Sequence, residues 1–332
     1  MKIADLHTPA LVIDADALEH NLVTMASARP GAELRPHVKA HKCTSLAAEQ
    51  VRHGHVRFTC ATPRELVGMA AAGVGEDLLL ANESLDPLRL RAMAAAQDQT
   101  MVTIAVDSQE TIAAAASAGI DHVLIDVNVG LPRCGCDPAD AGRLADLARR
   151  SGLNVRGTMG YEGHLMQMPD RVDQRRRTEA AIEILRRAAA DVGGEIISTG
   201  GSGTHDIHGH DVEVQAGSYA LMDTHYQLLE MPFRQACFVI GTAISVRPTF
   251  AVADVGLKAL GMDHGNPQID DAEVMFCSDE HITFVPTRSI AIGEPVQVTP
   301  AHIDPTMSQH ECAWLVREED VIDRWPIDLR GW

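Results

Sequence analysis

Eight short apolar runs, rich in strand-forming residues, recur along the first two thirds of the chain and constrain its fold most. They are "AELRPHVK" (32–39), "HVRFTCA" (55–61), "DLLLAN" (77–82), "MVTIAVD" (101–107), "HVLIDVN" (122–128), "VRGTMGY" (155–161), "EIISTG" (195–200) and "VEVQAG" (212–217). Segments such as "PRELVGMAAAG" lie between them, with apolar residues at helical spacing and a closing glycine. This alternation predicts an α/β chain with a parallel (β/α)8 TIM-type barrel, although the count alone does not exclude a doubly wound sheet.

The sequence changes in character after about residue 235. Stretches such as "CFVIGTAISVRPTFAVADVG" and "ITFVPTRSIAIGEPVQVTP" are punctuated by proline and glycine and show little helical spacing. For a chain of 332 residues we therefore expect two domains, a barrel over 15–235 and a β-rich domain over 236–332. The first strand-like run precedes the barrel, so residues 1–14 are expected to join the β-rich domain.

Charge and cysteine content narrow the class of protein. The net charge of -18 argues against a nucleic-acid-binding surface, and no apolar run approaches the length of a membrane span. The basic stretch 173–190 interleaves arginine with apolar residues at helical spacing, as a solvated helix face does. Seven cysteines without a C-x-x-C pair suit a reducing compartment. With no signal-peptide pattern at the N-terminus, we expect a cytoplasmic protein.

Positive and titratable groups gather in "RPHVKAHK" (35–42), where the first barrel strand ends. A lysine at the inner end of a barrel strand is costly to bury as a cation, so it must be paired, deprotonated or bonded covalently. A Schiff base with a carbonyl compound meets all three needs. A lone lysine more often points to solvent, so the interpretation of Lys39 and Lys42 depends on the other strands.

The other strands bring unusual residues to the same rim, because the carboxyl ends of all barrel strands face one side. Arg133 follows the fifth strand, and the sixth ends in "GYEGHLMQ", which contains Tyr161 and His164. "GGSGT" (200–204) and "AGSY" (216–219) follow the seventh and eighth strands, where barrels commonly bind phosphate through backbone amides. A lysine together with a phosphate cradle is what pyridoxal phosphate requires.

The C-terminal region offers pairs of metal ligands. His302 and Asp304 stand two residues apart, so in an extended strand both would face one side and could share a divalent ion. The stretch 310–312 offers an H-x-C pair of the same geometry, and spacing does not separate the two. The stretches 263–264 and 279–281 also combine histidine with carboxylates. An isolated H-x-D is more often an exposed polar strand or loop.

Taken together, "TPALVIDADALEHNL", "RPHVKAHK", "GLPRCG", "TGGSGT", "QAGSYALMD", "DVGLKAL", "SDEH" and "PAHIDPT" closely resemble the D-threonine aldolase and D-serine dehydratase group of pyridoxal-phosphate enzymes. This group is similar to alanine racemase in fold (fold type III), and the resemblance runs from about residue 6 to the end of the chain. It implies a homodimer that acts on a small D-β-hydroxy-amino acid, with a divalent metal beside the cofactor.

The resemblance also implies roles for individual residues. The match to "PHVKxHK" makes Lys39 the Schiff-base lysine, and the match to "RCG" places Arg133 on the phenolic oxygen of the cofactor. We also count Tyr161 among the cofactor-binding residues. The residues that fall where the family holds the phosphate are Gly201, Ser202, Gly203, Thr204, Gly217, Ser218 and Tyr219.

The family's metal motif selects His302 and Asp304 over the pair in 310–312. The aldolases resemble this chain in carrying aspartate at the second position, whereas the dehydratases usually carry cysteine. A carboxylate suits manganese or magnesium, and a thiolate favours zinc. The resemblance therefore implies an aldolase that uses Mn²⁺, with Mg²⁺ or Zn²⁺ as alternatives.

The implied reaction is retro-aldol cleavage of a D-β-hydroxy-α-amino acid to glycine and an aldehyde. The base is His164 or a metal-bound water. Many aldolases read like "YHGxxQH" where this chain reads "YEGHLMQ", so their later histidine falls near Gln167, and His164 occupies a nearby position. The alternative is a dehydratase of D-serine or D-3-hydroxyaspartate. An amino-acid racemase would leave the metal pair without a task, and a non-catalytic pyridoxal-phosphate carrier resembles the barrel alone.

Overall fold

The computed structural model describes all residues from Met1 to Trp332. The backbone forms two compact units, each assembled from separate segments. The β unit comprises Met1–Thr24, Ala40–Leu46 and Ser218–Asp328, and the barrel unit comprises Met25–Lys39, Ala47–Gly217 and Leu329–Trp332. From the sequence we expect each domain to be one continuous range, 15–235 for the barrel and 236–332 for the β-rich domain, whereas each unit here combines several segments. None of the helices has the length and apolar character needed to span a bilayer.

A parallel sheet in the order β2 to β8 forms the core of the barrel unit. Its strands are β2 (Arg57–Cys60), β3 (Asp77–Leu80), β4 (Met101–Val106), β5 (His122–Asp126), β6 (Asn154–Met159), β7 (Ile196–Thr199) and β8 (Glu213–Val214). The segment 34–37 closes the circuit, because Leu34 bridges Val214 of β8 and His37 bridges Thr59 of β2, both in parallel register. The structure thus has the parallel α/β barrel that the alternating runs predict.

The first predicted strand, 32–39, forms only these isolated bridges. Pro36 has no backbone N–H to donate, and short 3-10 helices flank the segment at Gly31–Glu33 (η2) and Val38–Ala40 (η3). Its backbone still pairs on both sides, since Arg35 N donates to Val214 O and Thr59 N donates to Pro36 O, both at 2.9 Å. The prediction of a full strand over 32–39 was therefore wrong, although the segment occupies the first strand position.

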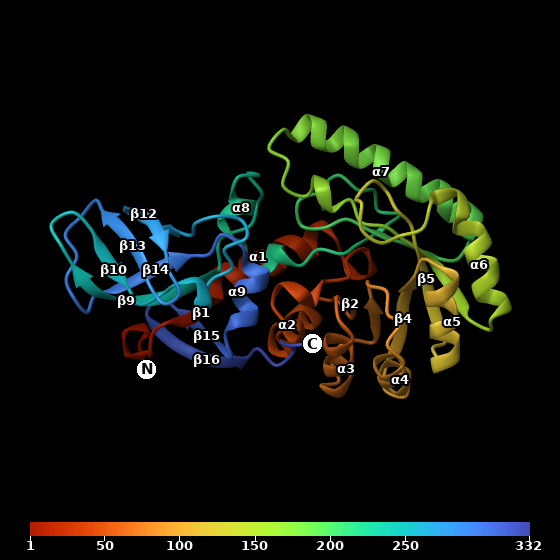
Figure 1. Cartoon of the computed structure of the whole chain (residues 1–332), viewed down its shortest axis with the longest axis horizontal. Helices are drawn as coiled ribbons and strands as arrows, with labels where there is room; N and C mark the ends of the chain where they lie inside the picture. The colour runs from red at the N-terminus through yellow and green to blue at the C-terminus, as the bar shows by residue number, and fades with distance from the viewer. The chain divides into compact units, whose positions relative to one another are not determined.

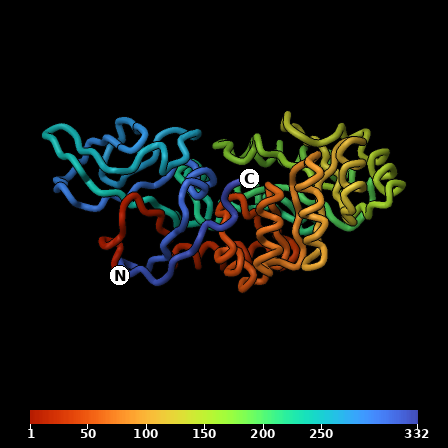
Figure 2. The backbone as a smooth tube through the Cα atoms, turned by 60° about the horizontal axis from the view of Figure 1, so that its bottom comes forward, coloured from red at the N-terminus to blue at the C-terminus, as the bar shows by residue number.

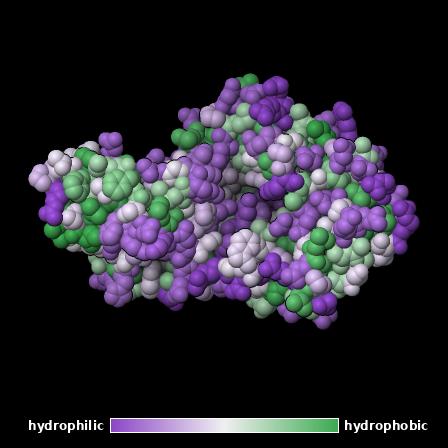
Figure 3. Space-filling model, in the orientation of Figure 1, coloured by the Kyte–Doolittle hydropathy of each residue, from purple (hydrophilic) through white to green (hydrophobic).

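Helices cover the outer face of the barrel strands (Figure 1). In chain order they are α2 (Thr44–Arg52), α3 (Pro63–Ala71), α4 (Pro87–Ala96), α5 (Gln109–Ala118), α6 (Ala141–Arg150) and α7 (Arg171–Val192). From α3 to α7, successive helices pack side by side, as the tube in Figure 2 shows. Caps start several of them: Thr62, Asp86 and Asp170 each accept hydrogen bonds from the first turn that follows. The outward surface of α7 is largely hydrophilic (Figure 3), as expected for the basic stretch 173–190.

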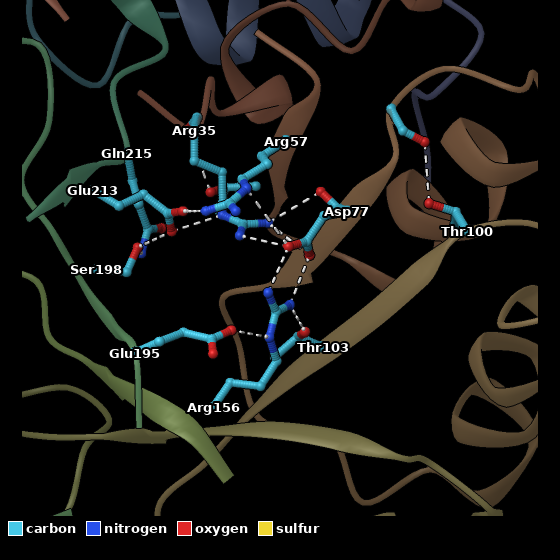
Figure 4. A network of polar contacts seen from close by, with 12 residues as sticks. Arg35, Arg57, Asp77, Thr100, Thr103, Arg156, Glu195, Ser198, Glu213 and Gln215 are labelled. Carbon is cyan, nitrogen blue, oxygen red and sulfur yellow. Dashed lines mark hydrogen bonds and ion pairs between the residues drawn. The ribbon is translucent and has the colours of Figure 1, made fainter. Parts of the chain in front are cut away.

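The amino ends of the barrel strands are held by a buried network of charges (Figure 4). Arg35 donates to Glu213 Oε1 at 2.7 Å and to both carboxylate oxygens of Asp77 at 3.1 Å. Arg156 donates to Asp77 Oδ2 at 2.8 Å and to Thr103 Oγ1 at 2.7 Å. These contacts tie the first strand position to β3, β4, β6 and β8, so the network fixes the register at this end of the barrel.

The β unit is a nine-stranded sheet in the order β10-β13-β12-β11-β14-β9-β1-β15-β16. Its strands are β1 (Ala10–Asp14), β9 (Cys237–Val246), β10 (Ala251–Ala253), β11 (Gln268–Ile269), β12 (Ala272–Cys277), β13 (Ile282–Pro286), β14 (Pro295–Thr299), β15 (Cys312–Arg317) and β16 (Asp320–Pro326). Strand β9 also pairs with β10, which closes six strands into a small ring. Strand β1 lies between β9 and β15 and is hydrogen-bonded to both.

Three helices accompany this sheet: α1 (Ala15–Ala28), α8 (Thr224–Gln227) and α9 (Ile303–Gln309). Asp223 connects α8 and α9, because its Oδ1 accepts from Tyr226 N at 2.9 Å and its Oδ2 accepts from Ile303 N at 3.0 Å. The 3-10 helix η7 (Leu257–Ala259) packs against α9, where Gln309 donates to Leu260 O at 3.1 Å. The start of α9 is thus held by Asp223, and its end by the segment that follows η7.

Candidate active site

Lys39 lies at the carboxyl end of the first strand position, within η3. The backbone leading to it is fixed, since His37 N donates to Ala216 O at 2.9 Å, next to β8. The Lys39 side chain is half-buried, and its Nζ lies 5.6 Å from the centre of the Tyr161 ring. An ammonium over an aromatic face is a favourable cation–π arrangement. The Lys39 amine therefore lies at the carboxyl-end rim of the barrel, where the sequence analysis expects the site.

Tyr161, in the turn that follows β6, brings three predicted residues together. The guanidinium carbon of Arg133 lies 5.3 Å from the ring centre, so the same ring attracts both Arg133 and Lys39. Small residues make room for this ring: a Cβ on Gly163 would lie 2.4 Å from Tyr161 Cε1, and one on Gly201 would lie 3.6 Å from Cε2. Lysine, arginine and the glycine-rich loop therefore meet around one aromatic side chain.

The glycine-rich loop after β7 is braced by a buried carboxylate, Glu162. Glu162 accepts hydrogen bonds from Thr204 Oγ1 at 2.9 Å, His208 Nε2 at 2.9 Å, Thr199 Oγ1 at 3.0 Å and Gly200 N at 3.3 Å. Burial acts to raise the pKa of Glu162, but hydrogen bonds from His208 and Thr204 outweigh it, so the pKa lies below its ordinary value. Glu162 is therefore an anion that holds both ends of the loop.

Further side chains hold the backbone carbonyls of this loop. Arg29 donates from Nε to His205 O at 2.9 Å and from Nη1 to Gly209 O at 2.8 Å. Arg171 donates to Gly203 O at 2.9 Å, and a Cβ added to Gly203 would lie only 1.8 Å from Met166 O. Because the carbonyls point towards these donors and the backbone packs this closely, the loop is preorganised before any ligand arrives.

His164, the predicted base, is exposed and lies in the 3-10 helix η5 (Gly163–Leu165). Its ring lies beside Gly130 of the loop after β5, where an added Cβ would be 3.2 Å from its Cε1. Partial burial and the nearby Arg177 lower the pKa of His164. The imidazole is therefore mainly neutral near pH 7 and can accept a proton.

The residues predicted to hold phosphate after β8 divide between the two units. Gly217 ends a segment of the barrel unit, whereas Ser218 and Tyr219 belong to the β unit, in the 3-10 helix η6 (Ser218–Ala220). Tyr219 is fully buried, with its ring 5.6 Å from that of Phe233. Ser218 Oγ donates to Asp304 Oδ1 at 3.4 Å, so the structure connects it with a predicted metal ligand.

The candidate metal residues lie where η7 and its following loop meet α9. His302 Nδ1 lies 2.7 Å from Asp263 Oδ2, and the His302 ring stacks on His264 with centres 3.9 Å apart and planes 8° apart. Asp263, His264 and His302 each offer a ligand atom, all within 4.8 Å of one another. His225 completes the group of rings, edge-on to His264 at 4.6 Å.

The extended strand expected at 302–304 is absent. His302 has extended dihedral angles, but the chain turns helical at Ile303, so Asp304 lies in the first turn of α9. The carboxylate of Asp223 accepts from Ile303 N and thereby stabilises this helix start. The geometric argument that both side chains face one side of a strand was therefore wrong, and the helix start positions Asp304 instead.

The donor sets fit the two groups that the sequence implies. In the barrel unit, a primary amine that can react with a carbonyl and a guanidinium lie over one ring, and Gly201 of the glycine-rich loop lies beside the same ring. In the β unit, imidazole nitrogen and carboxylate oxygen around His302 are ligands that divalent manganese, magnesium or zinc accepts. The two cations and the ring that they share belong to the barrel unit, and the group around His302 belongs to the β unit.

Sequence reasoning missed Glu162, and it named Asp263 only as one of several candidates without selecting it. Glu162 was present in "GYEGHLMQ", and its partner His208 in a histidine-rich stretch, but they are 46 residues apart. Asp263 and His264 stood among several histidine–carboxylate pairs, with Asp263 39 residues before His302. For Glu162 the usable signal was a carboxylate directly after an assigned site residue, Tyr161, and for Asp263 it was the pair "DH" directly before Gly265.

Comparisons with known proteins agree with this architecture. The family model "Alanine racemase, N-terminal domain" matches residues 13–224, and the model of the serine dehydratase domain matches residues 236–316. The fold and the lysine-bearing rim thus define an alanine racemase-like protein.

More specific relatives cover almost the whole chain. The D-threonine aldolase of Arthrobacter sp. is 30% identical over 99% of this chain and 94% of its own length. The 3-hydroxy-D-aspartate aldolase of Paracoccus denitrificans is 28% identical over 100% of this chain and 94% of its own length. The crystal structure of D-threonine aldolase from Filomicrobium marinum is 31% identical with a TM-score of 0.94, over 100% of this chain and 98% of that one. The chain therefore belongs to the alanine racemase N-terminal domain family and, within it, to the group that includes the D-threonine aldolases.

Proposed function

We propose that the chain is a carbon–carbon lyase that uses pyridoxal phosphate and a divalent metal to cleave D-β-hydroxy-α-amino acids into glycine and an aldehyde. The observation that carries this proposal is the meeting of Lys39, Arg133 and Tyr161 at the carboxyl rim of the barrel. Relatives that are named aldolases, at 28% to 31% identity over the full chain, support the reaction type.

In this proposal most of the cofactor-binding residues belong to the barrel unit. Lys39 would hold the cofactor covalently, its amine condensing with the carbonyl group with loss of water, and Arg133 would donate to the phenolic oxygen. The backbone of Gly201, Ser202, Gly203 and Thr204, together with Gly217, Ser218 and Tyr219, holds the phosphate. When bound, pyridoxal phosphate supplies an electron sink for the bond that breaks at Cα. The anionic Glu162 keeps the glycine-rich loop in position for this task.

His302 and Asp304 of the β unit are the proposed metal ligands, with Mn²⁺ as the first choice and Mg²⁺ or Zn²⁺ as alternatives. A bound divalent ion lowers the pKa of an alcohol that coordinates it. His164 is the proposed base that accepts the proton of the β-hydroxyl, because its lowered pKa keeps its imidazole neutral. His302 and Asp304 belong to the β unit, and His164 belongs to the barrel unit.

The second candidate is a dehydratase that removes water and then ammonia from D-serine or D-3-hydroxyaspartate. It is favoured by a relative named D-threo-3-hydroxyaspartate dehydratase from Delftia sp., 28% identical over 78% of this chain. Against it, Asp304 supplies a carboxylate where the resemblance associates cysteine with dehydratases. A racemase, or a non-catalytic carrier of the cofactor, would leave the group around His302 without a task.

Product analysis separates these candidates. The protein, supplied with pyridoxal phosphate, is incubated with D-threonine, D-serine and D-threo-3-hydroxyaspartate, with and without Mn²⁺. Glycine and an aldehyde that appear only with metal support the aldolase. Ammonia and an oxo acid support the dehydratase, and neither pair of products with any substrate would overturn both.

We also propose that the enzyme works as a homodimer in the cytoplasm. The resemblance supports the homodimer. All seven cysteines lack disulfide partners, which supports a reducing compartment. The molar mass from light scattering tests the oligomer: about twice the 35.8 kDa of one chain agrees with it, and a monomer at working concentration contradicts it.

A further inference from the structure

Asp263 is a candidate positioning residue because its carboxylate contacts Nδ1 of His302, which leaves the other ring nitrogen, Nε2, for a metal. Its Oδ2 lies 2.7 Å from His302 Nδ1, and a carboxylate only accepts hydrogen bonds, so Nδ1 carries the proton. The Nε2 lone pair of His302 is then the one left for an ion. In metal proteins, a carboxylate that accepts from the distal ring nitrogen fixes the tautomer and the ring orientation of a histidine ligand.

The stacking of His264 on His302 decides what His264 does. The ring centres are 3.9 Å apart and the planes are 8° apart. Imidazole lone pairs lie in the ring plane, so those of two parallel stacked rings do not converge on one point between them. A single ion in the plane of His302 is thus badly placed for His264, even though their nitrogens lie within 4.8 Å. The contact holds the plane of the His302 ring instead.

The backbone segments that carry Asp263 and His302 lie very close together at Gly261. Gly261 forms an antiparallel bridge with His302, and a Cβ on Gly261 would lie 2.3 Å from Pro305 Cγ and 2.8 Å from His302 O. Gly261 N donates to Thr306 Oγ1 at 2.9 Å, and Thr306 Oγ1 donates to His302 O at 2.7 Å. The loop that carries Asp263 is therefore fixed against the start of α9, which positions the carboxylate for His302.

We infer that Asp263 is a positioning residue for the metal ligand His302, and that His264 acts as its stacking partner and not as a ligand. This inference rests on the proposed function, since it takes His302 as a ligand. Of the three residues in this group, His302 coordinates the metal directly, and Asp263 and His264 hold the His302 ring in place. The remaining protein ligand is Asp304.

Metal binding, measured without substrate, tests the inference. The dissociation constant of Mn²⁺ is obtained by electron paramagnetic resonance of free Mn²⁺ for the cofactor-loaded protein. We expect Asp263→Asn to raise it by about 10- to 100-fold, the range found when such outer partners are removed. Asp270→Asn removes an exposed carboxylate of the same unit and is the matched control for charge, with no expected change.

Two substitutions at His264 separate stacking from ligation. His264→Phe keeps a flat ring without nitrogen and is expected to bind Mn²⁺ as the wild type does, whereas His264→Ala binds it more weakly. If His264→Phe weakens binding as strongly as His302→Ala does, His264 is a ligand and the inference is wrong. Unchanged binding in Asp263→Asn would equally overturn the positioning role.

His302→Ala keeps this test distinct from that of the proposed function. If His302→Ala binds Mn²⁺ normally, the proposed metal site itself is wrong. If His302→Ala loses Mn²⁺ while Asp263→Asn retains it, the site is correct and only the inference fails. Folding of each variant is checked by circular dichroism and by retention of the cofactor's visible absorbance, which depends on the barrel unit.

Discussion

The two ends of the barrel hold their cationic side chains in different ways. At the amino ends of the strands, Arg35 and Arg156 are bonded to Asp77 and Glu213, so each guanidinium meets a carboxylate (Figure 4). At the carboxyl ends, the cationic groups of Lys39 and Arg133 lie over one aromatic ring. A cation–π contact contributes about 0.5–2 kcal/mol to stability. Removing one partner of a buried ion pair costs more, about 3–5 kcal/mol.

This difference separates the end that stabilises the barrel from the end that does chemistry. A cation that is bonded to a carboxylate in a closed network is not easily exchanged for another group. A cation over a ring can exchange that weak contact for a carbonyl or a phenolic oxygen. Substitutions at the amino end should therefore reduce stability, and substitutions at the carboxyl end should reduce cofactor binding.

The largest expected effect is at Asp77. Asp77→Asn leaves Arg35 and Arg156 buried with less compensating charge, so we expect the free energy of unfolding to fall by about 3–5 kcal/mol. Urea unfolding followed by circular dichroism measures this. The exposed Asp98→Asn, which changes net charge equally, should stay within about 0.5 kcal/mol of the wild type. If Asp77→Asn unfolds like the wild type, the amino-end network is not a source of stability.

The same network predicts an acid dependence of stability. Burial acts to raise the pKa of Asp77, but Arg35 and Arg156 lower it more, so its pKa in the folded chain lies well below the ordinary 3.8. A carboxyl with a depressed pKa stabilises the fold above its unfolded pKa and loses that contribution as the pH falls. The free energy of unfolding of the wild type should therefore drop more steeply below about pH 4 than that of Asp77→Asn. Parallel pH curves for the two proteins would contradict this.

Glu162 should have a smaller effect on stability and a clear effect on the cofactor. Glu162→Gln replaces an anion that accepts from four donors by a neutral amide, which costs about 1.5–3 kcal/mol for hydrogen bonds to a charged group. If half of this appears in binding, the dissociation constant of pyridoxal phosphate rises by about 4- to 13-fold. Titration by visible absorbance measures it, with the exposed Glu179→Gln as control. Unchanged affinity would mean that the loop does not depend on this carboxylate.

The smallest expected effect on stability, and the sharpest on function, is at Lys39. Lys39→Ala removes a half-buried side chain whose amine lies over the Tyr161 ring, so the free energy of unfolding should change by less than in Asp77→Asn. The visible absorbance of the protein with pyridoxal phosphate should disappear, because the amine proposed to bond to it is gone. Retained absorbance with Lys42 intact would assign the role to a different lysine.

The barrel was predictable because its strands are buried runs with glycine-bounded helices between them, a pattern carried locally by the sequence. Lys39, Arg133 and Tyr161 were predictable as neighbours because each follows a strand end, and the strand order brings those ends together. The segment 32–39 did not form a regular strand, because Pro36 lacks a donor and 3-10 turns flank it.

The unpredicted contacts depend on tertiary packing. Glu162 meets His208, and Asp263 meets His302, only because loops distant in sequence pack together, and nothing in their spacing reports this. The relation between His302 and Asp304 was misjudged because Asp223, 80 residues before Ile303, caps the start of α9 and turns the chain helical between them. Spacing rules hold only where the backbone conformation is known.

The most direct test of the account is the stoichiometry of products from D-threonine with the cofactor-loaded protein and Mn²⁺. We predict equal amounts of glycine and acetaldehyde, none from L-threonine, and none from Lys39→Ala, which should remain folded. Ammonia and a four-carbon oxo acid in place of glycine, or full activity in Lys39→Ala, would contradict the account.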